Sequence, residues 1–587
     1  MNKTKLFPFF LFFTLIVFAQ EEEEDLGTQE VTVIKSYTPS LQDVFKLRES
    51  PKIIDSIVSP KKKVSYEIFS VPVASTFVPS KGTARKLQPK KTKPQFNSKA
   101  SLAFGNFNQL RLEYTTNYAI DRRQKIDWLV YFNGLLKTID EVQLNTQQGH
   151  ALFNISHQYA TNKRNAFSQV NFRQHQQAFY GLRNPLQDDF IIQQVQPKQQ
   201  LNYLSLSSTW QWYDPIVKEI ALNTYLTTDA FNTSEVEVDF STKFQLLLGG
   251  VSLTLLPEVT YLTTSFEDDF YTRTAVDYNA GNARLSFFVS KIRGKFKFKA
   301  GAKGVYGIGN EFDETALFVY PELALSYRPQ KGNFAPFLNI SGSLKQNSFR
   351  AFSHENPYVA PTLDLRAGNI PYNIQLGTRS KFSTGWEFQW NLFYQQNKNQ
   401  PLFRNLGIEI DRTNILPYRY ANAFEVSYAS ITTAGVAVQL GAAFKNGGQL
   451  QFKARYANYI FDDATDVTPI FEQTAFNLPE LSLQFNGTLK VKQRLYLQWY
   501  LNHFGARQNA YRDNFLGQDL ANAPFLIEDL NSYTQFDLNL QFQLNERWEI
   551  FAKGQNLLNE ANYRWSNYRV YGTQIMLGTR YNFDLAF

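Results

Sequence analysis

The sequence contains no cysteine and only two methionines in 587 residues. Without cysteine it offers no disulfide framework, no lipid attachment through a thiol and no thiolate metal site. Beyond an apolar run near its start, it has no hydrophobic stretch of the roughly 20 residues that a membrane-spanning helix needs. These absences exclude an α-helical membrane protein and a disulfide-stabilised scaffold.

Residues that could carry out chemistry are also scattered. The five histidines fall on different predicted strands and loops, without the spacing of a metal-binding motif: His150, His157, His175, His354 and His503. Carboxylate runs at 188–189, 267–269 and 462–463 could bind a cation such as Ca²⁺, but solvation of exposed loops is the simpler explanation. The net charge of +8 forms no patch that would suggest nucleic acid. We therefore expect no enzymatic activity, no cofactor and no nucleic acid partner.

The first 19 residues have the pattern of a secretory signal peptide. Lysines at positions 3 and 5 precede an apolar run over 6–18, and Val17-Phe18-Ala19 resembles a cleavage site. The run is too short to cross a bilayer as a helix. We expect residues 1–19 to be removed before Gln20.

Alternation of apolar and polar residues is clearest near the C-terminal end. Over 536–544 and 575–587, apolar residues alternate with amide, charged or small ones. A period of two with one apolar face is typical of a β-strand. A soluble sandwich would bury that face against a second sheet, whereas a membrane barrel turns it toward lipid. The predicted signal peptide and the aromatic content of 16% favour the barrel.

From residue 98 onward the chain repeats a pattern of strand, turn, strand and loop. We place 22 strands, among them 419–444, 474–490 and 567–587. Short turns such as 121–124, 161–164 and 329–332 alternate with longer loops at 181–198, 349–369, 401–418, 461–473 and 506–529. Outer-membrane barrels alternate short periplasmic turns with longer extracellular loops. The sequence therefore predicts an all-β, transmembrane antiparallel β-barrel of about 22 strands, in the outer membrane of a Gram-negative bacterium, with both chain ends in the periplasm.

Residues 20–97 differ in composition from the predicted barrel. They begin with an acidic run over 21–25, contain six prolines between 51 and 94, and carry a basic tract over 81–93. So many prolines and charges are typical of an extended segment rather than a filled globular domain. The expected organisation is a signal peptide over 1–19, a short extended periplasmic segment over 20–97 and the barrel over 98–587.

Three short motifs resemble TonB-dependent outer-membrane receptors, a family with a 22-stranded barrel. The run 554–559, Gly-Gln-Asn-Leu-Leu-Asn, is similar to the family's signature before its last loop. The run 356–361, Asn-Pro-Tyr-Val-Ala-Pro, is similar to a strand entry of the family, and 392–394 with 420–423 and 435–436 is similar to a pair of long strands. The resemblance covers about residues 98–587 and implies the receptor barrel.

The N-terminal region departs from that family. Its receptors carry a plug domain inside the barrel that is larger than residues 20–97, and the glycine-rich plug motifs are not visible here. The resemblance is therefore to a plugless barrel of the Bacteroidetes type. The segment Glu30, Val31, Thr32, Val33 and Ile34 resembles a TonB box, which pairs with TonB by strand addition. Its alternative interpretation is an ordinary piece of extended linker.

Two further groups of residues are candidate sites. Long predicted loops contain aromatic residues that form either a ligand mouth or contacts between loops: Phe349, Phe352, Tyr358, Phe504, Tyr511 and Phe515. The alternating residues at the end of the chain are predicted to be its signal to the barrel-assembly machinery: Tyr581, Phe583, Leu585 and Phe587.

Three functions agree with these patterns. A receptor would bind an external ligand and import it with TonB. A scaffold would anchor residues 20–97 so that they dock a periplasmic or outer-membrane complex. A porin would conduct passively. A 22-stranded lumen is too wide for its own wall side chains to fill, so a closed barrel needs an infolded segment, loops or a partner. We expect outer-membrane lipid and the barrel-assembly machinery as partners, with TonB or a periplasmic protein meeting residues 20–97.

Overall fold

The computed structural model describes residues 65, 96–183, 198–309, 316–329, 333–382, 385–409, 416–445, 447–462, 474–514, 523–560 and 563–585. The chain divides into two units, Met1–Gln88 and Pro89–Phe587, and every strand and helix below belongs to the second. The predicted signal peptide, the Glu30–Ile34 segment, Phe515 and Phe587 lie outside the described residues.

Twenty-two antiparallel strands form a closed ring, which confirms the predicted fold class. The first eleven are β1 (Ser98–Gly105), β2 (Gln109–Ala119), β3 (Gln124–Leu135), β4 (Gln148–Ala160), β5 (Arg164–Ala178), β6 (Lys198–Trp212), β7 (Val217–Thr228), β8 (Ser234–Leu248), β9 (Val251–Phe266), β10 (Val276–Arg293) and β11 (Phe296–Gly309). The others are β12 (Leu317–Tyr327), β13 (Phe334–Lys345), β14 (Gly368–Lys381), β15 (Trp386–Asn405), β16 (Phe424–Ala443), β17 (Gln449–Phe461), β18 (Leu481–Lys492), β19 (Leu495–Phe504), β22 (Tyr533–Gln543), β23 (Trp548–Gln555) and β26 (Gln574–Phe583). Each strand pairs with the next in this order.

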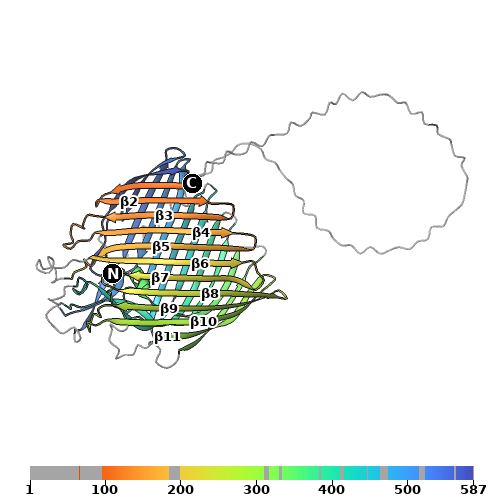
Figure 1. Cartoon of the computed structure of the whole chain (residues 1–587), viewed down its shortest axis with the longest axis horizontal. Coiled ribbons are helices and arrows are strands. Elements are labelled where there is room, and N and C mark those ends of the chain that lie inside the picture. The colour runs from red at the N-terminus through yellow and green to blue at the C-terminus, as the bar shows by residue number, and fades with distance from the viewer. Residues whose placement is uncertain are drawn as a thin grey trace, which may run out of the picture. The chain divides into compact units, whose positions relative to one another are not determined.

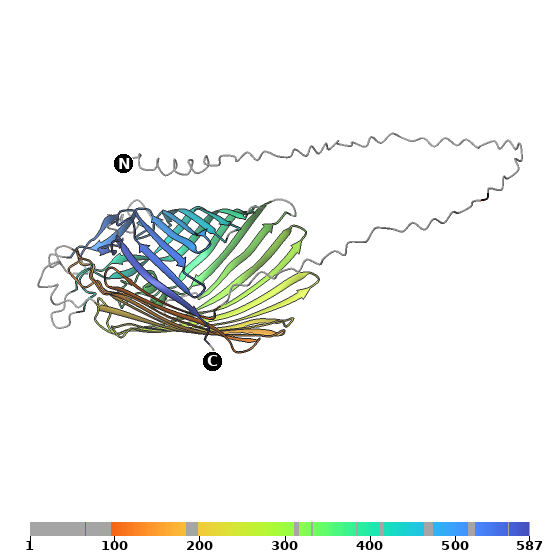
Figure 2. The ribbon, with the colours of Figure 1, turned by 90° about the horizontal axis from the view of Figure 1, so that it is seen from above.

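The ring closes where the first strand meets the last. β1 pairs antiparallel with β26, from Ser98 opposite Phe583 to Gly105 opposite Met576. Asn97 extends this pairing, because its amide Nδ2 donates to the Leu585 carbonyl at 2.8 Å and its Oδ1 accepts from the Leu585 N–H at 2.7 Å. Figure 2 shows the blue C-terminal strands beside the orange N-terminal strands. A closed ring leaves no unpaired strand edge, which a bilayer requires.

The two ends of the barrel differ in their connections, and we call them the turn end and the loop end. At the turn end, on the right in Figure 1, successive strands join through short turns. Gly249 and Gly250 connect β8 to β9 with φ of +55° and +77°, as a two-residue hairpin turn requires. At the loop end, on the left, longer connections join β3 to β4, β13 to β14 and β15 to β16.

Side chains alternate between the outside of the ring and its lumen. On β26, Ile575 and Leu577 are 55% and 63% exposed, whereas Met576 between them is buried. In a membrane barrel, side chains on the outside meet lipid. The outward apolar face is the one predicted from period two, and the sandwich interpretation is wrong because the sheet closes on itself.

The predicted loops contain regular structure that the sequence did not indicate. Helix α3 (Phe349–Glu355) lies in the predicted loop 349–369, where the Ser348 side chain caps it by accepting from the Ala351 N–H at 3.2 Å. No helix in the described ranges is long and apolar enough to cross a membrane. Strands β20 (Arg507–Arg512) and β21 (Phe525–Leu530) lie in the predicted loop 506–529 and continue the β19–β22 hairpin.

Strand limits also moved in places. β15 runs to Asn405, into the predicted loop 401–418, whereas β16, β18 and β26 begin five to seven residues later than predicted. The stretches before these three strands contain buried rings that pack among the loops: Tyr420, Phe476 and Tyr568. The alternation of apolar and polar residues therefore could not show at which residue strand pairing starts.

Candidate functional site

The loop end contains the largest buried apolar cluster among the described residues. Ten of its aromatic members come from loops and strand ends distributed around the ring, and we call these ten the loop core: Phe179, Tyr180, Phe270, Phe349, Phe352, Tyr358, Tyr418, Phe424, Trp565 and Tyr568. Tyr358 and Tyr568 stack with ring centroids 3.5 Å apart. Rings of this size dominate the apolar area that a core buries.

The loop core reaches across the mouth of the barrel. Asn422, in the connection from β15 to β16, donates from its side-chain amide to the Phe179 carbonyl at 2.6 Å, and Phe179 follows β5. These connections are ten strands apart along one side of the 22-membered ring and twelve along the other, so they start from opposite sides. The Tyr568 hydroxyl donates to the Asn422 carbonyl from a third connection. Side chains and backbone carbonyls of separate loops therefore meet over the lumen.

Helix α3 is fixed to the barrel wall by two glutamates of β8. Glu235 accepts from the backbone N–H of Phe349 at 2.6 Å and of Arg350 at 2.9 Å, and from the Thr264 hydroxyl at 2.8 Å. Glu237 forms an ion pair with the Arg350 guanidinium, whose Nε lies 3.1 Å from its carboxylate. Hydrogen bonds to a charged group contribute about 1.5–3 kcal/mol each. The wall thus carries a specific attachment for α3.

A second polar contact joins the connection after β5 to the β20–β21 hairpin. Arg183 forms a two-pronged ion pair with Glu528, at 2.9 and 2.6 Å, and its guanidinium lies 3.7 Å from the centre of the Tyr511 ring. Asn509 donates to the same carboxylate at 2.8 Å. The planar guanidinium suits a carboxylate and an aromatic face together.

A cavity of about 480 Å³ lies between the loop core and the wall strands. Rings of Tyr358, Trp565 and Tyr568 form its border with the loop core, and Phe504 and Tyr533 belong to the wall. Among the described residues that line it, Arg564 is the one charged side chain, and the other polar ones are mainly amides: Gln148, Gln484, Asn502, Gln535, Gln555, Asn556 and Gln574. Burial raises the pKa of the Tyr358 phenol to about 12, so that phenol stays uncharged. Rings and amides together suit a polar ligand with a flat face.

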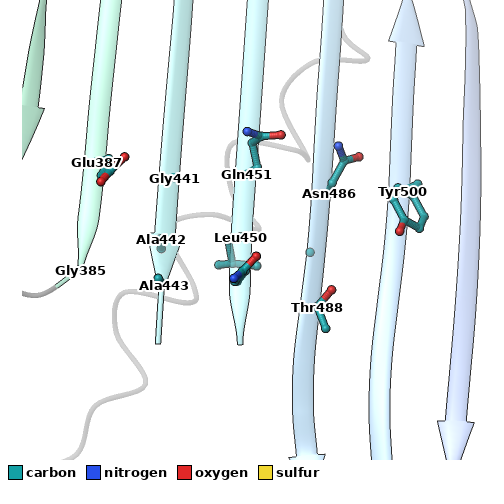
Figure 3. Close-up of a pocket in the computed structure, with 12 residues that line it drawn as sticks. Gly385, Glu387, Gly441, Ala442, Ala443, Leu450, Gln451, Asn486, Thr488 and Tyr500 are labelled. Carbon is teal, nitrogen blue, oxygen red and sulfur yellow. The ribbon is translucent and has the colours of Figure 1, made fainter. Parts of the chain in front are cut away.

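The inner wall at the turn end is built differently. A hollow of about 420 Å³ lies over β15 to β19. Figure 3 shows Glu387, Gln451 and Tyr500 among the side chains that line it. Gly441 lies opposite Glu387 and Gln451 in the inward-facing row, so the wall adds little bulk at this position of β16.

The predicted ligand-mouth aromatics that the structure describes lie in three places. Phe349, Phe352 and Tyr358 are buried in the loop core, where they pack loops against one another. Phe504 borders the cavity and stacks on Tyr533 at 5.1 Å, whereas Tyr511 faces Arg183. Phe515 lies outside the described residues. The assignment of these rings to a ligand mouth stays a prediction.

The predicted assembly signal lies on the last strand. Tyr581 and Phe583 stack at 5.6 Å, and Tyr114 of β2 stacks on Phe583 at 6.4 Å. Leu585 bonds to Asn97, and Phe587 lies outside the described residues. A role of these residues in barrel assembly stays a prediction.

Three of the five histidines meet inside the barrel. His150 and His175 face each other across β4 and β5 with ring centroids 5.9 Å apart, and His354 of α3 stacks on Tyr203 at 4.2 Å. Desolvation lowers the pKa of His354 to about 4, and the charges of Arg173 and Arg350 add to this effect. The predicted turn 161–164 implies this register, because pairing outward from the turn brings His150 opposite His175. Within the described ranges, no group of three or more histidines and carboxylates is arranged to hold a metal ion.

One of the predicted loop carboxylates has a structural role. Asp269 accepts from the backbone N–H of Tyr271 at 3.0 Å and of Thr272 at 2.7 Å, which closes a turn. Glu235 and Arg183, which help to organise the loop core, were not predicted, because each is a single polar residue that no local pattern distinguishes. Asn422 was recognised only within the motif at 420–423, which was expected to belong to a pair of long strands.

Comparisons with solved structures identify the same barrel in receptors of low sequence identity. No family model and no curated protein matches the sequence. A mutant of the ferric enterobactin receptor PfeA from Pseudomonas aeruginosa is 12% identical, with a TM-score of 0.57 over 84% of this chain and 81% of that one. The siderophore receptor PirA from Acinetobacter baumannii is 10% identical, with a TM-score of 0.59 over 84% and 81%.

The FrpB iron transporter from Neisseria meningitidis (F5-1 variant) is also 10% identical, with a TM-score of 0.60 over 84% of this chain and 83% of that one. At these identities the likeness shows the fold. The chain is a closed, 22-stranded transmembrane barrel of the architecture found in these receptors.

Proposed function

We propose that the chain is an outer-membrane receptor that binds a ligand from outside the cell and admits it when the loop core opens. The observation that carries this proposal is the contact between Asn422 and Phe179 across the mouth. A mouth held by about ten packed rings supports gated entry over passive conduction, because a porin needs an open path. The cavity behind the loop core offers rings and amides to a ligand that passes the mouth.

The proposed orientation follows from the pattern of connections. The longer loops face the outside and the turns face the periplasm, with both chain ends there. Residues 1–19 act as the signal peptide, and residues 20–97 form a periplasmic extension in place of a full plug domain. Within it, Glu30–Ile34 would pair with TonB by strand addition.

A substitution that blocks strand addition tests the TonB contact. Thr32→Pro removes a backbone N–H and fixes φ, whereas Thr32→Ala keeps both free. Affinity purification of the full chain from native outer membranes should recover TonB with the wild type and Thr32→Ala, but not with Thr32→Pro. Equal recovery of TonB with all three chains, or with none, would count against energised import.

A scaffold is the second candidate, favoured by the charge pattern of residues 20–97. An acidic run over 21–25 and a basic tract over 81–93 give this segment two surfaces of opposite sign for partner proteins. The same purification distinguishes the candidates. Recovery of periplasmic or assembly proteins that depends on 81–93 and is unchanged in Thr32→Pro would support the scaffold.

A further inference from the structure

The β10–β11 hairpin is the most basic element of the barrel. Between Asp277 and Glu311 the sequence contains no acidic residue, and all its charged side chains are basic: Arg284, Lys291, Arg293, Lys295, Lys297, Lys299 and Lys303. The whole chain has a net charge of only +8, so this hairpin holds a large share of the excess positive charge.

The basic residues of this hairpin fall into two groups. Those nearer the middle of the wall have acidic partners: Arg284 pairs with Glu258 at 3.5 Å, and Lys299 with Glu322 at 2.7 Å. The four at the tip, 291, 293, 295 and 297, are exposed. No ion pair or side-chain hydrogen bond joins them to any residue in the described ranges. Their charge is available to a ligand outside the chain.

Lys291 and Arg293 face outward, on the side that meets lipid. They continue the row of β10 that contains Leu285 and Phe287, which are 52% and 49% exposed. Lys291 lies opposite Phe298, and Arg293 opposite Phe296, in the register with β11. Directly paired residues of an antiparallel sheet point to the same face. Two cations therefore lie beside two rings at the turn-end limit of the apolar surface.

Aromatic packing holds this surface in place. Phe296 and Phe298 stack at 5.9 Å, and Tyr327 of β12 lies 4.9 Å from Phe296. Aromatic side chains of membrane barrels gather at the level of the lipid headgroups. Residues two apart along a strand are separated by about 6.6 Å, so Lys291 and Arg293 can reach one phosphate from both sides.

We propose that Lys291, Arg293, Phe296 and Phe298 form a binding site for the phosphate of an anionic phospholipid at the turn end of the barrel. The rings lie against the upper acyl chains, and the two cations bind the phosphate. An acidic protein is the other possible partner of a basic surface. The outward position of both cations, in line with lipid-facing residues, favours the lipid.

Native mass spectrometry tests this proposal on the full-length protein. The protein is released from bilayers of phosphatidylcholine with phosphatidylglycerol, and the lipids that stay bound are counted. We expect wild-type protein to retain phosphatidylglycerol selectively. Lys291→Gln/Arg293→Gln should bind it about thirtyfold more weakly, because the variant loses two basic side chains that each contact the lipid phosphate. Heat-modifiable migration confirms that each variant is a folded barrel.

The matched control removes the same charge from the same hairpin. Lys295→Gln/Lys297→Gln should keep the selective lipid, because Lys297 lies opposite Ile292 in the inward-facing row. Equal retention by all three proteins, or equal loss in both double variants, would overturn the site. Recovery of an acidic protein instead of lipid, lost equally in both variants, would overturn it as well.

Discussion

The two ends of this barrel use the same ring of strands and fill it in opposite ways. At the loop end, Tyr358, Phe424 and Tyr568 are buried among loops that meet over the lumen. At the turn end, Gly441 of β16 lies in the inward-facing row and borders a hollow of about 420 Å³. The side chains of the wall cannot fill a ring of 22 strands, so closing it needs loops, an infolded segment or a partner.

The largest expected effect comes from removing the centre of the loop core. Tyr568→Ala loses a fully buried ring that stacks on Tyr358 and a hydrogen bond to Asn422. Truncation of a large buried aromatic costs about 3–5 kcal/mol. We expect a lower unfolding midpoint and an increase in ion conductance across planar bilayers.

Tyr500→Ala is the matched control at the turn end. Tyr500 borders the hollow there and is 45% exposed, so its truncation should change stability by less than about 0.5 kcal/mol. If Tyr500→Ala destabilised the barrel as much as Tyr568→Ala, the contrast between the two ends would be wrong.

Loss of the α3 attachment should have the next largest effect. Glu235→Gln replaces a carboxylate oxygen with an N–H₂ that faces the backbone N–H groups of Phe349 and Arg350. We expect a cost of about 2 kcal/mol and faster hydrogen exchange over 349–355. Asp239→Asn, on the same strand and bonded only to Thr260 among the described residues, should leave exchange of α3 unchanged. Equal hydrogen exchange over 349–355 in both variants would show that Glu235 does not attach α3 to the barrel wall.

A single methyl group added at Gly181 should disturb the packing of Tyr568 in the loop core more mildly. At Gly181 a Cβ would lie 2.6 Å from Cε2 of Tyr568, whereas at Gly304 it would meet nothing within 4 Å. Overpacking a filled site costs about 1–3 kcal/mol. The thermal unfolding midpoint of Gly181→Ala should therefore lie below that of Gly304→Ala. Identical midpoints would show that the loop core is loosely packed.

The smallest effect concerns pH. The folded-state pKa of His354 is lowered to about 4, below its ordinary value of 6.5. Protonation therefore favours the unfolded state, so this contribution is complete above about pH 6.5 and is lost as the pH falls toward 4. Because His354 is partly exposed, solvent reduces the effect. The unfolding midpoint of wild type should fall slightly more than that of His354→Gln over this interval; parallel curves would contradict the assignment.

Period two predicted the strands, and together with the predicted signal peptide and the aromatic content it predicted the ring. The apolar residues that alternate over 575–583 form the outward face of β26. This face could be predicted because the alternation of side chains between the two faces of a strand depends only on neighbours in sequence. The turn at 161–164 likewise sets the register that brings His150 to His175.

The loop core could not be predicted in this way. Asn422 meets Phe179 across 243 positions, and Glu235 meets Phe349 across 114. Such contacts depend on the closed ring, which brings opposite loops together only after all strands have paired. Aromatic loops were recognised by composition, but composition does not distinguish a ring that contacts a ligand from one that packs against another loop.

Planar-bilayer conductance of a chain without residues 20–95 tests the central claim most directly. The signal peptide is kept, and the purified barrel is compared with the full-length protein. If the loop core closes the mouth, both wild-type barrels should stay closed, whereas the shortened chain with Tyr568→Ala should conduct in stable steps. Stable conductance of the shortened wild-type barrel would show instead that the N-terminal segment closes the lumen and that the loops do not.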